Sequence, residues 1–211
     1  MLKEIIRKAA EDLKAREKAR DEAYSRVRRA RVLSKQAILL LHNGDREKAA
    51  SNLDEAGALL TEIKVYSEEY LEIGFYEAVE AARQEYAEAS ILNGLNTGKG
   101  YPMPELLGLN SKNYLLGLAD VPGELRRQTL DLLRAGDLET AEANLDSMEE
   151  IYINLTGMEE ASLLLKGLRR KLDVVRMVNE RTRAEITTET SRERLRTVSY
   201  THLTLPTTPY V

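Results

Sequence analysis

Four carboxylates have the types and spacing to form a site for a hard divalent cation. Glu85 and Glu88 are three residues apart, and Asp120 and Glu124 are four residues apart. If both segments are helical, each pair lies on one helix face. Two such faces brought together would form a pocket of oxygen ligands, which Mg²⁺ and Mn²⁺ prefer. Taken alone, a Glu pair at this spacing is more often a solvated helix face, and a lone Asp is more often an N-cap.

The shortage of histidine and cysteine narrows the chemistry that these carboxylates could perform. The chain has no cysteine and two histidines, His42 and His202. These counts exclude thiolate metal sites and a paired-histidine ribonuclease mechanism, and they argue against a Cys or Ser–His nucleophile. Phosphodiester cleavage by such a chain needs Mg²⁺ or Mn²⁺, which orients a water, lowers its pKa and neutralises charge on the scissile phosphate.

Composition places the chain among cytoplasmic proteins without membrane contact. With 211 residues, of which 43% are hydrophobic, it is long enough for one sizeable domain. The absence of cysteine favours a reducing compartment. No apolar run approaches the roughly 18 residues of a membrane span, and residues 1–7 lack the apolar core of a signal peptide.

Charge is divided along the chain. Residues 1–36 carry 12 Lys or Arg against 6 Asp or Glu, residues 37–160 carry 9 against 24, and residues 161–211 carry 10 against 5. Basic ends around an acidic middle are what a protein needs if its ends hold a polyanion and its middle holds cations. Two solvated amphipathic helices at the ends would produce the same division.

The element pattern predicts an all-α bundle of six to seven helices with a very long N-terminal helix. Good helix formers dominate and no stretch alternates apolar and polar residues. The first helix is expected over residues 3–42, because no Gly or Pro occurs before Gly44, and it needs partners along its whole length to bury its apolar stripe. Further helices are predicted over the following ranges: 46–64, 67–95, 111–135, 137–156 and 159–188.

Two irregularities in this pattern bear on the site and on the turns. Pro122 and Gly123 lie inside the helix predicted over residues 111–135, so this helix either kinks there or restarts with Asp120 as the cap and Pro122 in the first turn. The pattern Leu-x-x-Gly-Asp-x-Glu-x-Ala-x-x-Asn-Leu-Asp occurs twice, beginning at Leu41 and at Leu133. Two copies are too few for a solenoid, and we interpret both as helical hairpins with Gly ending one helix and Asp capping the next.

The C-terminal segment 197–211 differs from the rest of the chain. It has no charged residue, five threonines and two prolines. It resembles translated sequencing-adapter read-through, so we expect residues 1–196 to form one all-α domain and residues 197–211 to be a non-native, disordered tail.

The segment 113–127, Asn-Tyr-Leu-Leu-Gly-Leu-Ala-Asp-Val-Pro-Gly-Glu-Leu-Arg-Arg, resembles a motif of the translin family. The likeness is greater to the catalytic branch, translin-associated factor X, than to translin. The segment 84–89, Gln-Glu-Tyr-Ala-Glu-Ala, resembles the second signature of that branch, and the helix order over about residues 5–190 also fits. The first motif is long and fairly specific, whereas the second is short.

This resemblance implies a translin-like fold, assembly into a hollow homo-octameric barrel and metal-dependent endonucleolytic cleavage of single-stranded RNA inside it. Glu85, Glu88 and Asp120 match the catalytic carboxylates of the branch, and Glu124 matches the acidic residue beside them. We assign the first three to Mg²⁺ or Mn²⁺ coordination, with Glu124 as a further ligand or as the group that positions the water. The alternative is a non-catalytic protein that binds single-stranded RNA or DNA, and a helical scaffold without nucleic-acid affinity is a third interpretation.

Two departures from the family pattern shape these expectations. Residues 76–83 are acidic, whereas the translin branch carries an Arg/His-rich nucleic-acid cluster at this position, so RNA contacts are expected elsewhere. The long insertion of animal members before the Asp120 motif is missing, which suggests a compact archaeal-type member that assembles with itself. The candidate RNA-binding residues are Arg126 and Arg127 beside the acidic motif, together with Arg20, Arg28, Arg29, Arg169, Arg170 and Lys171 on the basic terminal helices.

Overall fold

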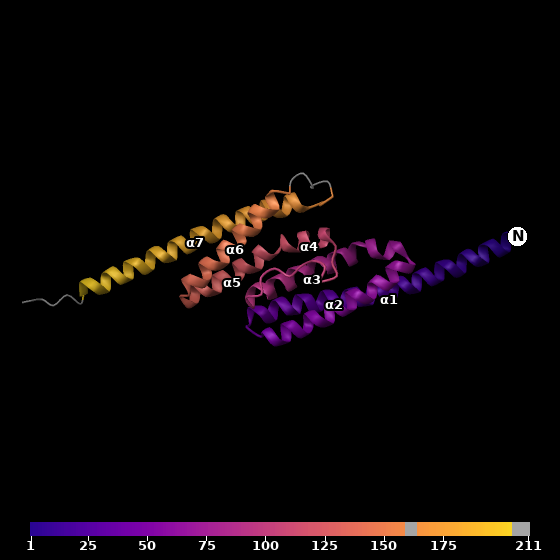
Figure 1. The fold of residues 1–211 in the computed structure, drawn as a ribbon, viewed down its shortest axis with the longest axis horizontal. Helices are drawn as coiled ribbons and strands as arrows, with labels where there is room; N and C mark the ends of the chain where they lie inside the picture. The colour runs from indigo at the N-terminus through magenta and orange to yellow at the C-terminus, as the bar shows by residue number, and fades with distance from the viewer. Residues whose placement is uncertain (159–163, 204–211) are drawn as a thin grey trace, which may run out of the picture.

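The computed structural model describes residues 1–158 and 164–203, apart from the side chains of Phe75 and of residues 197–203. Within these residues the chain forms seven α-helices and one 3₁₀ helix and contains no strand, which confirms the predicted all-α fold (Figure 1). The helices are α1 (Leu2–His42), α2 (Arg46–Glu69), η1 (Leu71–Phe75), α3 (Glu77–Asn96), α4 (Ser111–Leu118), α5 (Val121–Ala135), α6 (Leu138–Thr156) and α7 (Leu168–Leu203).

The long helix α1 is packed against the rest of the chain only in its C-terminal part. Its buried residues begin at Ala19 and continue at helical spacing through Val27, Ala30 and Leu33 to Leu41, where α2 and α3 lie against it. Before Ala19 only Arg16 is partly buried, where it pairs with Glu72 of η1 at 2.6 Å, and the other residues of this segment, which projects beyond the bundle, are exposed (Figure 1). Within the described chain, α1 therefore has partners along only part of its length.

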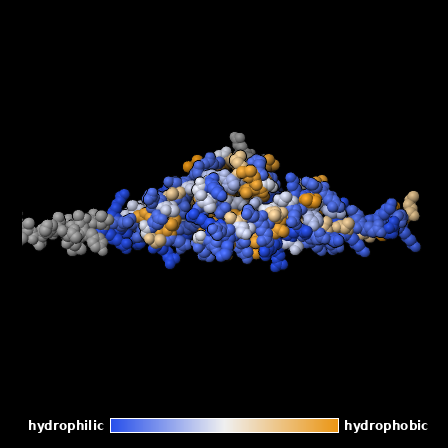
Figure 2. All heavy atoms as spheres, turned by 60° about the horizontal axis from the view of Figure 1, so that its bottom comes forward, coloured by the Kyte–Doolittle hydropathy of each residue, from blue (hydrophilic) through white to orange (hydrophobic). Residues whose placement is uncertain are grey.

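The core joins all seven α-helices in one cluster. Its largest fully buried side chains come from different helices, including Ile63 of α2, Ile91 of α3, Leu125 of α5 and Met148 of α6. Burying each such side chain stabilises the fold by roughly 1.5–3 kcal/mol. The face drawn in Figure 2 is mostly hydrophilic, with hydrophobic residues in small patches. No helix in the described part of the chain is both long and apolar enough to span a bilayer.

Some helix boundaries differ from the predictions. The second helix continues to Glu69, and the third begins only at Glu77, because Tyr70 leaves the helical region at φ −127° and ψ 89° and a 3₁₀ turn intervenes. The last described helix begins at Leu168, after Gly167 at φ 93°, whereas the predicted start at residue 159 lies outside the described residues. It continues past residue 188, since the following segment contains helix formers and no Gly or Pro.

The backbone of α7 is helical as far as Leu203, so it includes the first part of the predicted tail. Residues 204–211 lie outside the described residues, as do residues 159–163. The assignment of 197–211 as a non-native tail stays a prediction.

The helix predicted over residues 111–135 is two helices. α4 ends at Leu118, α5 begins at Val121, and Pro122 occupies the first turn of α5, where its missing N–H costs no hydrogen bond. Asp120 holds the N-cap position of α5, as the second alternative predicted, but its side chain makes no capping hydrogen bond. Its carboxylate is therefore free to act elsewhere.

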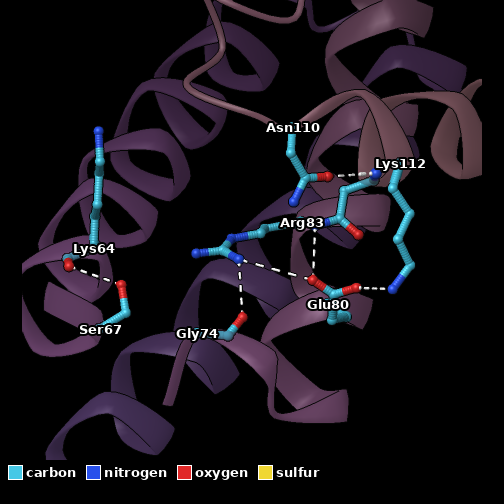
Figure 3. Close-up of polar contacts among 8 residues, drawn as sticks. Lys64, Ser67, Gly74, Glu80, Arg83, Asn110 and Lys112 are labelled. Atoms are coloured by element: carbon cyan, nitrogen blue, oxygen red, sulfur yellow. Dashed lines mark hydrogen bonds and ion pairs between the residues drawn. The ribbon is translucent and has the colours of Figure 1, made fainter. Parts of the chain in front are cut away.

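Polar contacts attach the start of α4 to α3. Glu80 of α3 pairs with the Lys112 ammonium at 2.5 Å and accepts a hydrogen bond from Asn113 Nδ2 at 3.1 Å (Figure 3). One turn further along α3, Arg83 donates to the Gly74 carbonyl of η1 at 3.1 Å. The acidic start of α3 thus includes a residue that holds α4 in place.

Gly117 permits the backbone of α4 to lie directly on α3. A Cβ atom at this position would be 2.5 Å from the Gln84 carbonyl oxygen, 2.6 Å from the Ala87 Cβ and 3.1 Å from the Glu88 nitrogen. Two of these three atoms belong to the α3 backbone, which cannot move aside as a flexible side chain can. Only glycine fits this contact.

We predict that Gly117→Ala destabilises the protein by about 1–3 kcal/mol, because the added methyl group forces α4 away from α3. The matched control is Gly123→Ala in α5, where a Cβ would meet no atom within 4 Å. There the replacement is expected to be neutral or stabilising by about 0.5–1 kcal/mol. Urea unfolding followed by circular dichroism measures both, and equal effects of the two substitutions would contradict the close-contact argument.

Candidate metal and RNA site

The four candidate carboxylates lie where α3, α4 and α5 meet. Glu85 and Glu88 are on successive turns of α3, Asp120 is at the α4–α5 junction, and Glu124 is in the first turn of α5. Because Gly117 lies against residues 84–88, the junction three residues later is brought to the α3 turn that carries the first pair. The structure therefore brings the two sequence pairs together.

Glu88 is at the centre of this group. Burial, and after it the nearby charges of Asp120, Glu124 and Glu85, raise the pKa of its carboxyl group to about 8, against the opposing effect of Lys171. Its carboxyl group makes no hydrogen bond to any other described residue. A carboxylate among carboxylates, largely withdrawn from water, is stabilised only by a proton or by an added cation.

The other three carboxylates each face a basic side chain. Glu85 accepts a hydrogen bond from Arg31 at 2.7 Å, with the Lys35 ammonium at 3.6 Å. Asp120 pairs with Lys171, whose ammonium also donates to the Leu116 carbonyl. These basic residues come from α1 and α7, which flank the carboxylates.

The third pair joins Glu124 to His42 at the end of α1. The His42 Nε2 atom lies 2.5 Å from a Glu124 carboxylate oxygen, and the imidazole side chain is 5% exposed. The hydrogen bond from His42 lowers the pKa of Glu124, while burial acts in the opposite direction. The His42 Nδ1 atom is buried without a hydrogen-bond partner among the described residues.

The oxygen atoms of the four carboxylates are of the type that a hard cation prefers, although they are not arranged as a ligand shell. Among residues 1–158 and 164–203, no three His, Asp or Glu side chains are arranged to hold a metal ion. Each of Asp120, Glu124 and Glu85 is drawn toward its own basic partner. One oxygen of Glu85, Oε2, is buried without any hydrogen-bond partner in the described structure, and Glu88 is repelled by its neighbours. Both features are those of a site that gains a cation.

The candidate RNA-binding residues beside the acidic motif have different surroundings. Arg126 donates to Glu185 at 2.8 Å and to Thr182 at 2.9 Å, so it joins α5 to α7. Arg127 is exposed and forms no ion pair with the described residues, yet it lies near enough to Glu124 to help lower the pKa of that carboxylate. Arg127 is thus better placed than Arg126 to meet a phosphate.

The candidate RNA-binding residues on the long helices α1 and α7 also differ in whether they form ion pairs. On α1, Arg20 pairs with Asp21, and Arg29 pairs with Glu55 of α2 at 3.1 Å, whereas the exposed Arg28 has no ion pair with a described residue.

On α7, Lys171 is held by Asp120, whereas Arg169 and Arg170 are exposed and form no ion pair within the described chain. Among the candidate RNA-binding residues, those whose guanidinium groups have no ion pair with a described residue are therefore Arg28, Arg127, Arg169 and Arg170.

Sequence patterns did not reveal the basic partners of the carboxylates. His42, Arg31 and Lys35 are on a helix that ends 43 residues before Glu85, and no local spacing connects them to it. The one available signal was that His42 is the sole histidine outside the C-terminal segment and occupies the last turn of its helix. That signal identifies a residue of interest without identifying its partner.

No protein-family model matches the chain. An uncharacterized protein of Methanocaldococcus jannaschii is 35% identical over 115 residues, which cover 54% of this chain and 51% of that protein. The chain thus spans about half the length of this curated relative.

Solved structures match over much more of the chain. A complex of AfC3PO with duplex RNA is 36% identical, has a TM-score of 0.80, and is matched over 91% of this chain and 98% of that one. A second solved structure, the crystal structure of AfC3PO, gives the same identity and coverage with a TM-score of 0.79. Apo-NeC3PO is 28% identical, with a TM-score of 0.78, over 87% of this chain and 96% of that one.

The raised pKa of Glu88 predicts a pH-dependent stability in the metal-free protein. This carboxyl group titrates near pH 4.5 when unfolded and near pH 8 when folded, so its contribution to stability is full below pH 4.5 and is lost as the pH rises through 8. The Glu88→Gln variant has no titrating group at this position, so it does not lose this stability as the pH rises. Its stability relative to the parent protein should therefore increase with pH, by up to about 1.4 kcal/mol per pH unit.

Urea unfolding at pH 5, 6.5 and 8 in EDTA measures this difference. Glu142→Gln, at an exposed carboxylate of α6, is the control and should show a flat profile. A difference between Glu88→Gln and the parent protein that does not change with pH would contradict the burial of Glu88 among like charges.

Proposed function

The chain belongs to the translin family, as its match to the C3PO structures shows, and from this premise we propose that it is a metal-dependent endoribonuclease for single-stranded RNA. One observation carries the proposal: Glu88, largely buried, is surrounded by the charges of Asp120, Glu124 and Glu85. Several like charges in a partly buried site destabilise the fold, so a purely structural role does not explain them. Carboxyl groups with strongly shifted pKa values are concentrated at functional sites.

The chemistry assigned to the site follows from its donors. Glu85, Glu88 and Asp120 would hold Mg²⁺ or Mn²⁺, and Glu124 would be a further ligand or would position the attacking water. The ion would supply charge neutralisation on the phosphate and a water of lowered pKa. The hydrogen bond from His42 fixes the orientation of Glu124 and keeps it ionised, so that it can accept a proton from water.

RNA binding is proposed to depend on the unpaired guanidinium groups. AfC3PO has been solved with duplex RNA, which supports an RNA-binding role for this chain as well. Arg127 is one turn from Glu124 and is the candidate for a phosphate near the scissile bond. Arg28, Arg169 and Arg170 are candidates for more distant phosphates. We propose that the chains assemble into the homo-octameric barrel that the family resemblance implies, with RNA held inside.

A non-catalytic RNA- or DNA-binding protein is the second candidate. It is favoured by one observation: Arg31, Lys171 and His42 already balance three of the four carboxylates. A site balanced in this way needs no metal to be stable. Such a protein would bind single strands in a salt-dependent manner, and binding would survive the loss of all four carboxylates.

We predict that the protein cuts a labelled single-stranded oligoribonucleotide with Mg²⁺ or Mn²⁺ and not with EDTA. Glu88→Gln and Asp120→Ala should each lower the cleavage rate by about 100-fold or more, because each removes a charge that the ion needs. The exposed Glu142→Gln is the matched control and should cut normally. Undiminished cleavage by either site variant would overturn the assignment, and RNA binding without cleavage would favour the second candidate.

A second prediction concerns the pairing of Lys171 with Asp120. A divalent ion must compete with this ammonium, so Lys171→Met should bind Mn²⁺ about 5-fold more tightly, in line with the ~1 kcal/mol of a partly exposed ion pair. Arg183→Met removes an ion pair with Glu149 at 2.5 Å, which involves none of the four carboxylates, and should leave affinity unchanged. Isothermal titration without RNA measures both, and weaker binding by Lys171→Met would show that the lysine supports the site.

A further inference from the structure

A cleft of about 420 Å³ lies beside the carboxylates. It is bounded by the α1–α2 turn, the end of α3, the C-terminal part of α5 and the start of α6. Its walls combine a few apolar residues and Gly44 with polar side chains, which include His42, Arg46, Asn96, Gln128, Asp131 and Asn144. A cleft of this size and polarity has room for one nucleotide unit and for hydrogen bonds to it.

The repeated sequence pattern builds two of the walls. Its two copies form the turns between α1 and α2 and between α5 and α6, where Gly44 and Gly136 adopt φ of 78° and 79° and an Asp caps the following helix. Arg46 follows the first cap, and Asn144 belongs to the second copy. The cleft therefore lies between two helix–turn–helix segments that share one sequence pattern.

The cleft is continuous with the candidate site. The His42 side chain lines the cleft, while its Nε2 atom contacts Glu124. Gln128 follows Glu124 by one turn of α5, a rise of about 6 Å, so both project from the same helix face. A nucleotide in the cleft would therefore be adjacent to the one whose phosphate is at the carboxylates.

Three amide side chains in the cleft have unused hydrogen-bonding groups. Asn96, Gln128 and Asn144 are partly buried, and their amides make no hydrogen bond to the described residues. A side-chain amide offers a donor and an acceptor side by side, which matches the edges of nucleobases. Arg46, exposed and without an ion pair in the described structure, adds a cation at the rim.

We propose that this cleft is a nucleobase subsite, which receives the base of a nucleotide flanking the scissile phosphate. The inference rests on the proposed endoribonuclease function and adds to it a subsite that recognises one base of the RNA. The amides of Gln128 and Asn144 hydrogen-bond the edge of the base, Asn96 bounds the opposite wall, and Arg46 contacts the adjoining phosphate. The alternative is that the space between the corners holds only solvent.

The test uses the full-length protein and a set of single-stranded RNAs in which one nucleotide at a time is abasic. With the parent protein, an abasic residue at one position next to the cleavage site should lower kcat/KM by about 10-fold or more. In the Gln128→Ala, Asn144→Ala double variant, intact RNA should be cut about 10-fold more slowly, and the abasic penalty at that position should disappear.

The matched control is Asn52→Ala. Asn52 occupies the same position in the first copy of the repeated pattern, is also partly buried, and lines a different cleft. It should retain the parent abasic profile. The proposal is overturned if the double variant also retains the abasic penalty, or if it changes the molar mass in light scattering, which would make the cleft a contact between copies of the chain.

A binding measurement separates this inference from the proposed function. If the parent protein cuts no RNA with Mg²⁺ or Mn²⁺, the proposed function fails, yet the cleft can still be tested with RNAs that carry 2-aminopurine at single positions. A fluorescence change confined to one position, and lost in Gln128→Ala, Asn144→Ala but kept in Asn52→Ala, supports the subsite. The same fluorescence response in the parent protein and in the double variant overturns it.

Discussion

The close approach of α4 to α3 at Gly117 is the contact on which the candidate site depends. It brings the α4–α5 junction against the turn that carries Glu85 and Glu88, and so places Asp120 and Glu124 near enough for their charges to act on Glu88. The pair of Lys112 with Glu80 fixes the other end of α4. Two consequences follow: a carboxyl group is buried among like charges, and the α5 face that continues toward Gln128 leads away from it into a cleft.

Electrostatic balance at the site comes from helices distant in sequence. Arg31 of α1 and Lys171 of α7 each form an ion pair with one carboxylate and His42 of α1 forms a hydrogen bond with a third, while Glu88 has no basic partner of its own. This arrangement stabilises the metal-free protein and leaves one carboxyl group whose ionisation requires an additional positive charge.

Much of the architecture was predictable because local signals are strong in this chain. Uninterrupted helix formers predict α1, and the Gly–Asp pairs at 44–45 and 136–137 predict the turns into α2 and α6. Predictions were wrong, or left two alternatives open, where tertiary contacts decide the backbone. The turn at residues 70–76 has no Pro and one Gly, and the choice between a kink and two helices at Pro122 depends on how α4 packs against α3.

The amino-acid sequence alone identifies the chemical groups available: four carboxylates at helical spacing, two histidines, no cysteine, and the motif that indicates the translin family. Spacing places residues on one face of one helix, so it could pair Glu85 with Glu88 and Asp120 with Glu124. The three-dimensional arrangement was needed to show that the pairs meet, that Glu88 is the member whose pKa the other three raise, and that Lys171 and Arg126 are paired with acidic residues while Arg127 has no ion pair among the described residues. The physical reason is that burial and ion pairing depend on side chains from α1, α5 and α7, whose separation along the chain carries no information about their distance in space.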